Sequence, residues 1–136
     1  MVDGGEQSSP SFIKGEPMTI QKLINKVDEE KPNSFQTEKL LEYINEIEAD
    51  VAEQLNLDAP EYAEEDRDEE LLAPAPYDRL YVSYLKSQID YANEEYASYQ
   101  LNAEQHVQDF ADFLNWAIRT GRTDSMLLPS RFKNVF

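Results

Sequence analysis

Residues 71–100, LLAPAPYDRLYVSYLKSQIDYANEEYASYQ, organise the rest of this chain. The stretch opens with Pro74 and Pro76 in an apolar setting and continues as one unbroken helical pattern that carries six tyrosines. A proline is tolerated near the first turn of a helix, where its missing N–H is not needed. Tyrosine buries a large ring while its hydroxyl stays solvated or paired, so tyrosine-rich helices are typical of contact surfaces. The pattern predicts a central helix that contacts other copies of protein.

The apolar rows of this helix predict both core and interface positions. One row holds Leu80, Tyr84 and Ile89, and the adjoining row holds Tyr81, Leu85, Ala92, Tyr96 and Tyr99. The candidates for a subunit interface are Tyr77, Tyr81, Tyr84, Tyr91 and Trp116. A core lined with tyrosine is the alternative, and periodicity leaves the choice open because one helix can serve core and interface on adjoining faces.

Two shorter helices are predicted before this stretch. The first spans residues 19–30, with Thr19 as N-cap, and ends because Pro32 disfavours helical geometry at the preceding residue. The second spans about residues 36–55. Its carboxylates at four-residue spacing lie off the apolar stripe and predict a solvated face: Glu42, Glu46, Asp50 and Glu53.

A fourth helix is predicted to start at Asn102, which forms a capping-box pattern with Gln105, and to close at Gly121 as a C′ residue. The short connection to the preceding helix predicts that the two are antiparallel neighbours. The fold class is therefore all-α: a small bundle of about four helices, two shorter N-terminal and two longer antiparallel C-terminal, with extended N- and C-terminal arms.

The chain divides into a flexible leader (residues 1–17), a helical domain (18–121) and an extended arm (122–136). Within the domain, residues 56–70 predict a mobile, self-repelling, extended acidic loop. Its candidates for an acidic or channel-lining face are Glu61, Glu64, Glu65, Asp66, Asp68 and Glu69. Asp66, Asp68 and Glu70 alternate as in a calcium loop, but Leu71 stands where that loop needs glycine, so calcium binding is disfavoured.

The C-terminal arm combines basic and apolar residues, in contrast to the acidic body. This contrast predicts that the arm docks on another subunit or on a partner; folding back over its own bundle is the alternative. The candidate docking residues are Arg122, Met126, Leu127, Leu128, Arg131, Phe132, Lys133 and Phe136.

Composition limits the function. The 136 residues carry a net charge of −16, which disfavours binding to nucleic-acid phosphates and favours basic partners, or a wall past which DNA slides. Without cysteine the chain has no disulfide and no thiolate metal site. We expect no membrane span and no secretory signal, and therefore a soluble protein made in the cytosol.

The sequence predicts no enzyme, no cofactor and no metal. His106 is the only histidine and has no cysteine or serine nucleophile in a catalytic motif. Four glycines are too few for a phosphate-binding glycine-rich loop. The paired glutamate and histidine motifs of di-iron bundles are also missing.

Five segments between Met18 and about Thr120 match a known pattern. They are TIQKLI with VDE and KPN (residues 19–33), YINEIE (43–48), LAPAPYD leading into LY (72–81), IDYAN (89–93), and FLNW with RT (113–120). In these residues the chain resembles the small head–tail connector, or adaptor, proteins of tailed bacteriophages and prophages. Two features depart from that family: the leader, and Glu94 where glycine is usual, which predicts that the helix runs straighter there.

The resemblance implies structural work in the virion. Family members form a dodecameric ring under the portal, bridge it to the next neck protein (a stopper or tail-completion protein), and continue the DNA channel without binding DNA specifically. It also implies a location in the neck between capsid and tail, after synthesis in the host bacterial cytoplasm.

A second hypothesis comes from acidity alone. An acidic DNA mimic or inhibitor that binds a basic host protein as a monomer or dimer would have the same charge balance. It would present a compact carboxylate array and would have no use for the C-terminal arm.

Overall fold

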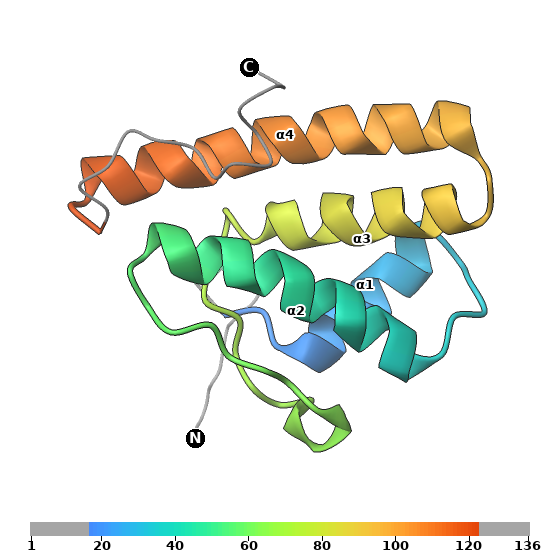
Figure 1. Cartoon of the computed structure of the whole chain (residues 1–136), viewed down its shortest axis with the longest axis horizontal. Helices are drawn as coiled ribbons and strands as arrows, with labels where there is room; N and C mark the ends of the chain where they lie inside the picture. Colours follow the sequence, from blue (N-terminus) through green and yellow to red (C-terminus); the bar gives the residue numbers. More distant parts are fainter. Residues whose placement is uncertain (1–16, 123–136) are drawn as a thin grey trace, which may run out of the picture.

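A computed structural model describes residues 17–122, and four α-helices account for most of that range. Their order and bounds are α1 (Ile20–Glu30), α2 (Thr37–Gln54), α3 (Arg79–Ala92) and α4 (Tyr96–Arg119), with a short 3₁₀ helix, η1 (Glu64–Asp66), between α2 and α3. The antiparallel pair α3 and α4 packs along its length, and α2 and α1 lie against α3 (Figure 1). The predicted all-α bundle of four helices with an antiparallel C-terminal pair is confirmed.

The first two helices begin and end within one residue of the predicted bounds. The Thr19 hydroxyl accepts from the Lys22 backbone N–H at 3.2 Å, which satisfies one of the N–H groups that a helix start leaves without a partner. Lys31, the residue before Pro32, leaves the helical conformation and ends α1.

The core lies where the apolar stripes of all four helices meet. Its members include Ile20, Leu23 and Val27 from α1; Leu40, Leu41, Ile44, Ile47 and Val51 from α2; Leu80, Tyr81, Leu85 and Ile89 from α3; and Phe110, Phe113 and Leu114 from α4. Burial of these side chains is the main force that holds the helices together.

The boundary between the third and fourth helices lies earlier than predicted. α3 ends at Ala92 and α4 begins at Tyr96, so the predicted break at Leu101–Asn102 is wrong. Asn102 lies inside α4 and does not cap it. α3 has 14 residues and α2 has 18. The prediction that both C-terminal helices are longer than the N-terminal ones is therefore wrong for α3.

The turn after α3 is made by Glu94, whose φ is +61°. The Glu95 N–H donates to the Asp90 carbonyl at 2.9 Å and the Glu94 N–H donates to the Tyr91 carbonyl at 3.0 Å. This pair of bonds defines a Schellman motif, which ordinarily has glycine at the left-handed position. The expectation that the helix runs straighter where Glu94 replaces glycine is therefore wrong: the tight turn is present with glutamate in the strained conformation.

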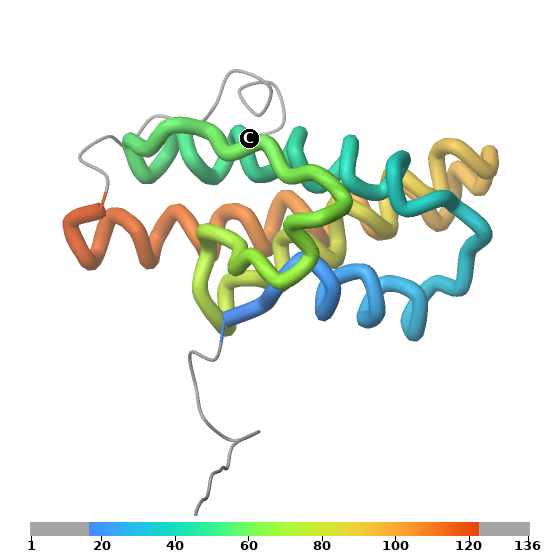
Figure 2. Tube along the Cα trace, turned by 90° about the horizontal axis from the view of Figure 1, so that it is seen from below, coloured from blue at the N-terminus to red at the C-terminus, as the bar shows by residue number. Residues whose placement is uncertain are grey.

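The segment after α2 is held against the bundle along much of its length. It runs back along α2 and crosses to the start of α1 (Figure 2). There the Ile20 and Gln21 N–H groups of α1 donate to the carbonyls of Glu69 (3.1 Å) and Arg67 (2.9 Å). The predicted extended, self-repelling loop is wrong in this respect, because backbone bonds to a helix N-terminus offset the repulsion between its carboxylates.

Within residues 17–122, no helix is long and apolar enough to cross a membrane.

Candidate interaction surfaces

The turn between α3 and α4 carries an exposed aromatic cluster, which we call the tyrosine end: Tyr91, Tyr96 and Tyr99 with Glu94 and Glu95. Tyr91 is 57% exposed and Tyr96 is 56% exposed. The Tyr91 ring lies 5.7 Å from that of Tyr96 and 5.2 Å from that of Tyr99, both centroid to centroid. Large apolar surface that is clustered and exposed marks interaction sites, whereas scattered exposed residues do not.

A second aromatic cluster lies near the C-terminus of α4, which we call the tryptophan end: Tyr77, Trp116, Arg119 and Arg122. Tyr77 and Trp116 stack with ring centroids 5.4 Å apart. The Arg122 guanidinium lies 4.8 Å from the Trp116 ring centroid, and Arg119 donates to the Tyr77 hydroxyl at 3.2 Å. Both arginines are exposed, so this end presents positive charge over half-buried aromatic rings.

The remaining two candidate interface tyrosines lie elsewhere. Tyr81 is fully buried in the core, so its prediction as an interface residue is wrong. It occupies the row of α3 that faces α2, where its hydroxyl finds a buried partner. Tyr84 is half-buried, and its hydroxyl donates to Glu46 at 2.8 Å.

That buried partner is Glu48, whose side chain is fully buried in the bundle. Its carboxylate accepts from the Tyr81 hydroxyl, from the Tyr62 hydroxyl at 2.7 Å and from the Leu72 N–H at 2.9 Å. The Ala73 N–H in turn donates to the Tyr81 hydroxyl at 2.9 Å. Glu48, its three partners and Ala73 form the Glu48 site, which joins α2, α3 and the segment between them.

Burial raises the pKa of Glu48, and the hydrogen bonds from Tyr81, Tyr62 and Leu72 oppose that rise without cancelling it. The pKa values of Tyr81 and Tyr62 are also raised, first by burial and then by the adjacent carboxylate. Each of the two tyrosines therefore keeps its proton and donates it in a hydrogen bond to the carboxylate.

A second buried carboxylate, Asp90, lies in the last turn of α3. Its partners are Lys31 Nζ at 2.6 Å, Ser98 Oγ at 2.7 Å and Asn102 Nδ2 at 2.6 Å, and together with Glu95 they form the Asp90 site. Glu95 also binds Lys31, at 2.8 Å. Burial by itself would raise the pKa of Asp90, but the lysine and the two neutral donors outweigh it and lower the pKa.

The acidic candidates lie on the surface of the segment between α2 and α3. Five are exposed (Glu61, Glu64, Glu65, Asp68 and Glu69), while Asp66 is half-buried and accepts from the Ala63 N–H at 2.8 Å. Within the described residues, no group of three or more carboxylates or histidines is placed to hold a metal ion. The alternating acids that suggested calcium therefore do not converge.

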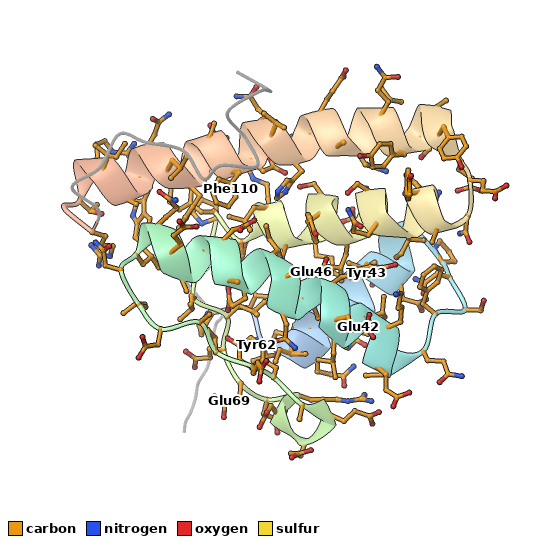
Figure 3. All side chains as sticks on the ribbon, in the orientation of Figure 1. Glu42, Tyr43, Glu46, Tyr62, Glu69 and Phe110 are labelled. Carbon is orange, nitrogen blue, oxygen red and sulfur yellow. The ribbon has the colours of Figure 1, made fainter. Side chains whose placement is uncertain are left out.

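A groove of about 520 Å³ lies between α2 and residues 59–61, and its lining is acidic. Glu42, Glu46 and Glu61 line it together with Ala49, Ala59 and Pro60. Glu42 and Glu46 project from α2 and Tyr62 lies on the segment beside it (Figure 3). Asn45 links α2 to the segment that follows it. Its side chain accepts from the Tyr62 N–H at 2.8 Å and donates to the Tyr62 carbonyl at 3.2 Å.

The solvated face predicted for α2 is correct for three of its carboxylates and wrong for one. Glu42, Glu46 and Glu53 are exposed, but Asp50 is 4% exposed. Because α2 contacts both α3 and η1, its covered surface is wider than its apolar stripe.

The sequence contained a usable signal for Glu48. Four residues after Ile44 and three before Val51, Glu48 lies on the apolar stripe of α2, away from the other carboxylates. A charge on an apolar stripe predicts a buried group with dedicated partners. Tyr96 was missed as a surface residue because it was placed inside the continuous helix, whereas it begins α4 beside the turn.

His106, the only histidine, belongs to the core. It is 5% exposed, its Nδ1 lies 3.0 Å from the Leu80 carbonyl oxygen, and its ring packs against Tyr84 and Phe110. Its place between α3 and α4 serves packing.

Of the predicted docking arm, Arg122 alone lies within the described residues, at the tryptophan end. Met126, Leu127, Leu128, Arg131, Phe132, Lys133 and Phe136 lie outside them, as does nearly all of the predicted leader.

No protein-family model, curated protein or solved structure matches this chain. The resemblance to head–tail connectors rests on sequence segments within residues 19–120.

Proposed function

We propose that this protein is a non-enzymatic structural subunit of a phage virion: a head–tail connector that assembles into a ring. The ring docks under the portal, bridges it to the next neck protein and continues the DNA channel. The four-helix bundle provides a rigid body for such work. The sequence segments that resemble connectors include the proline-rich entry to α3, whose Leu72 and Ala73 N–H groups are tied to the Glu48 site.

The observation that carries the proposal is the tyrosine end. Tyr91 and Tyr96 are both more than half exposed and lie against each other at one end of the molecule. Two tyrosine rings exposed together favour a protein contact, because a contact buries their carbon surface and leaves the hydroxyls free to bond.

The charge of the chain fits a channel wall. A net charge of −16 repels the phosphates of DNA, so DNA slides past the ring without sticking. The exposed carboxylates of residues 61–69 and of the α2 groove are the candidates for the wall or its rim.

The oligomeric mass of the purified protein tests the proposal. We expect a ring, either for the protein alone or on addition of DNA-filled heads that carry a portal, measured by light scattering and native mass spectrometry. A strict monomer that ignores such heads would contradict the proposal.

Deletion of residues 123–136 separates the connector from an acidic inhibitor of a basic host protein. The connector needs its basic and apolar arm, so the truncated chain is expected to lose recruitment to heads. An inhibitor would bind its basic target equally well with and without the arm. Recruitment of the truncated chain at the full-length level would contradict arm docking.

A further inference from the structure

We propose that the tyrosine end of one copy binds the tryptophan end of the next, so that copies join head to tail. This inference rests on the proposed function and names the contact that would build the ring. The two ends are different surfaces, and a contact between two different surfaces repeats from copy to copy until it closes.

The two ends lie at opposite extremities of the same helical hairpin. α4 has 24 residues and is about 36 Å long. The turn to α3 lies at one extremity and the C-terminus of α4 lies at the other (Figure 1). One copy therefore presents both halves of the contact to two different neighbours at once.

Charge makes the two ends complementary. The tyrosine end carries Glu94 and Glu95, and Glu95 is 52% exposed in spite of its bond to Lys31. The tryptophan end carries Arg119 and Arg122, both exposed. Like ends repel each other and unlike ends attract, which favours head-to-tail contact over a symmetric dimer of like ends.

The aromatic groups complete the contact. Exposed tyrosine rings at one end meet a Tyr77–Trp116 stack in which the Trp116 ring already packs against the Arg122 guanidinium. Arginine, tyrosine and tryptophan are the residue types that contribute most binding energy in protein interfaces, since they bury large surfaces and retain polar groups to pair. Each end thus holds both an aromatic anchor and a charge that matches the other.

Changing the charge of one end at a time tests the contact. Variant one carries Asn93→Lys and Glu94→Lys; both positions are exposed, and the bond between Glu95 and Lys31 is left in place. Variant two carries Arg119→Glu and Arg122→Glu. Each variant alone is expected to lose at least about tenfold in self-association, measured by light scattering and native mass spectrometry of the full chain.

An equal mixture of the two variants is the decisive sample. Every contact in an alternating assembly then joins a negative end to a positive end, so the mixture is expected to regain the wild-type mass with the two variants in equal amounts. Mass-labelled chains show the alternation directly. Because only correctly folded chains regain assembly on mixing, recovery also excludes misfolding as the cause of the losses.

The control reverses the charge of two side chains elsewhere on the molecule, as many as in variant two. Glu64→Lys with Glu65→Lys changes two exposed acids on η1, and it is expected to leave self-association unchanged. Wild-type assembly that persists in both end variants, or a mixture that stays dissociated, overturns the head-to-tail contact while the connector proposal stands. A wild-type chain that never assembles, with or without heads, overturns the connector proposal itself.

Discussion

The Glu48 and Asp90 sites each bury a carboxylate completely, yet they move its pKa in opposite directions. Glu48 is surrounded by neutral donors: two tyrosine hydroxyls and a backbone N–H. Asp90 has neutral donors as well, but it also has Lys31 at 2.6 Å. At Glu48 the hydrogen bonds oppose the effect of burial on the pKa without cancelling it, whereas at Asp90 the ammonium of Lys31, together with two neutral donors, outweighs that effect.

The two sites also do different structural work. Glu48 ties the segment before α3 to α2 and α3, so its partners come from far apart in the sequence. Asp90 ties the end of α1 to the α3–α4 turn, next to the tyrosine end. Loss of either site is therefore expected to disturb a different part of the molecule.

The largest expected effect comes from Glu48→Ala. The change removes three hydrogen bonds and leaves the Tyr81 hydroxyl and the Leu72 N–H as buried donors, so we expect a loss of about 4 kcal/mol in the free energy of unfolding. Urea denaturation measures the loss, and faster exchange of the Leu72 and Ala73 amides locates it. Glu53→Ala, at an exposed position of the same helix, is the control and should change stability by less than about 0.5 kcal/mol. A loss for Glu48→Ala as small as the control's would show that the site contributes nothing.

Removal of the cation tests the other side of the comparison. Lys31→Met leaves Asp90 buried without its countercharge, and we expect a loss of about 2 kcal/mol, less than for a fully buried pair because Lys31 is 24% exposed. The double variant Lys31→Met with Asp90→Asn should recover most of this loss, since no buried charge is then left unpaired. If the double variant is no more stable than Lys31→Met, the charge of Asp90 is not the reason for the loss.

The pH dependence of stability should have opposite signs at the two sites. The raised pKa of Glu48 means that its contribution is greatest below its unfolded pKa of about 4.3 and declines as pH rises through the folded pKa. The lowered pKa of Asp90 means that its contribution is present above about pH 3.9 and is lost as pH falls through the folded pKa.

Urea denaturation between pH 2.5 and 7 measures both slopes, each at most about 1.4 kcal/mol per pH unit. Wild type minus Glu48→Gln isolates the first slope, and wild type minus Asp90→Asn isolates the second. Slopes of the same sign would contradict the opposite pKa shifts of Glu48 and Asp90, and with them the role of Lys31 in lowering the pKa of Asp90.

The smallest effect concerns the turns that follow the two sites. Asn56 after α2 and Glu94 after α3 both have positive φ, +59° and +61°, but asparagine tolerates that conformation better than glutamate. We expect Glu94→Gly to stabilise the fold by about 0.5–1 kcal/mol and Asn56→Gly by a few tenths, measured as shifts in the urea midpoint. An equal gain at both positions would show that residue type does not set the strain.

Local signals predicted α1 and α2 well and the α3–α4 boundary poorly. Thr19 and Pro32 limit α1 through bonds and clashes within a few residues, so the sequence alone was sufficient. The turn at Glu94 has no such residue. Next to this turn, Lys31, Ser98 and Asn102 contact Asp90, and these three residues are brought to Asp90 by the fold.

Sequence by itself determined the helix class, the four apolar stripes and the aromatic content of the α3–α4 region, since these follow from periodicity and local preference. Only the tertiary structure decided which tyrosines are buried. Tyr81 faces the buried carboxylate of Glu48, while Tyr91 and Tyr96 lie at a turn that nothing in the described chain covers. The physical reason is that burial depends on how helices distant in the sequence pack against one another, which periodicity within one helix does not record.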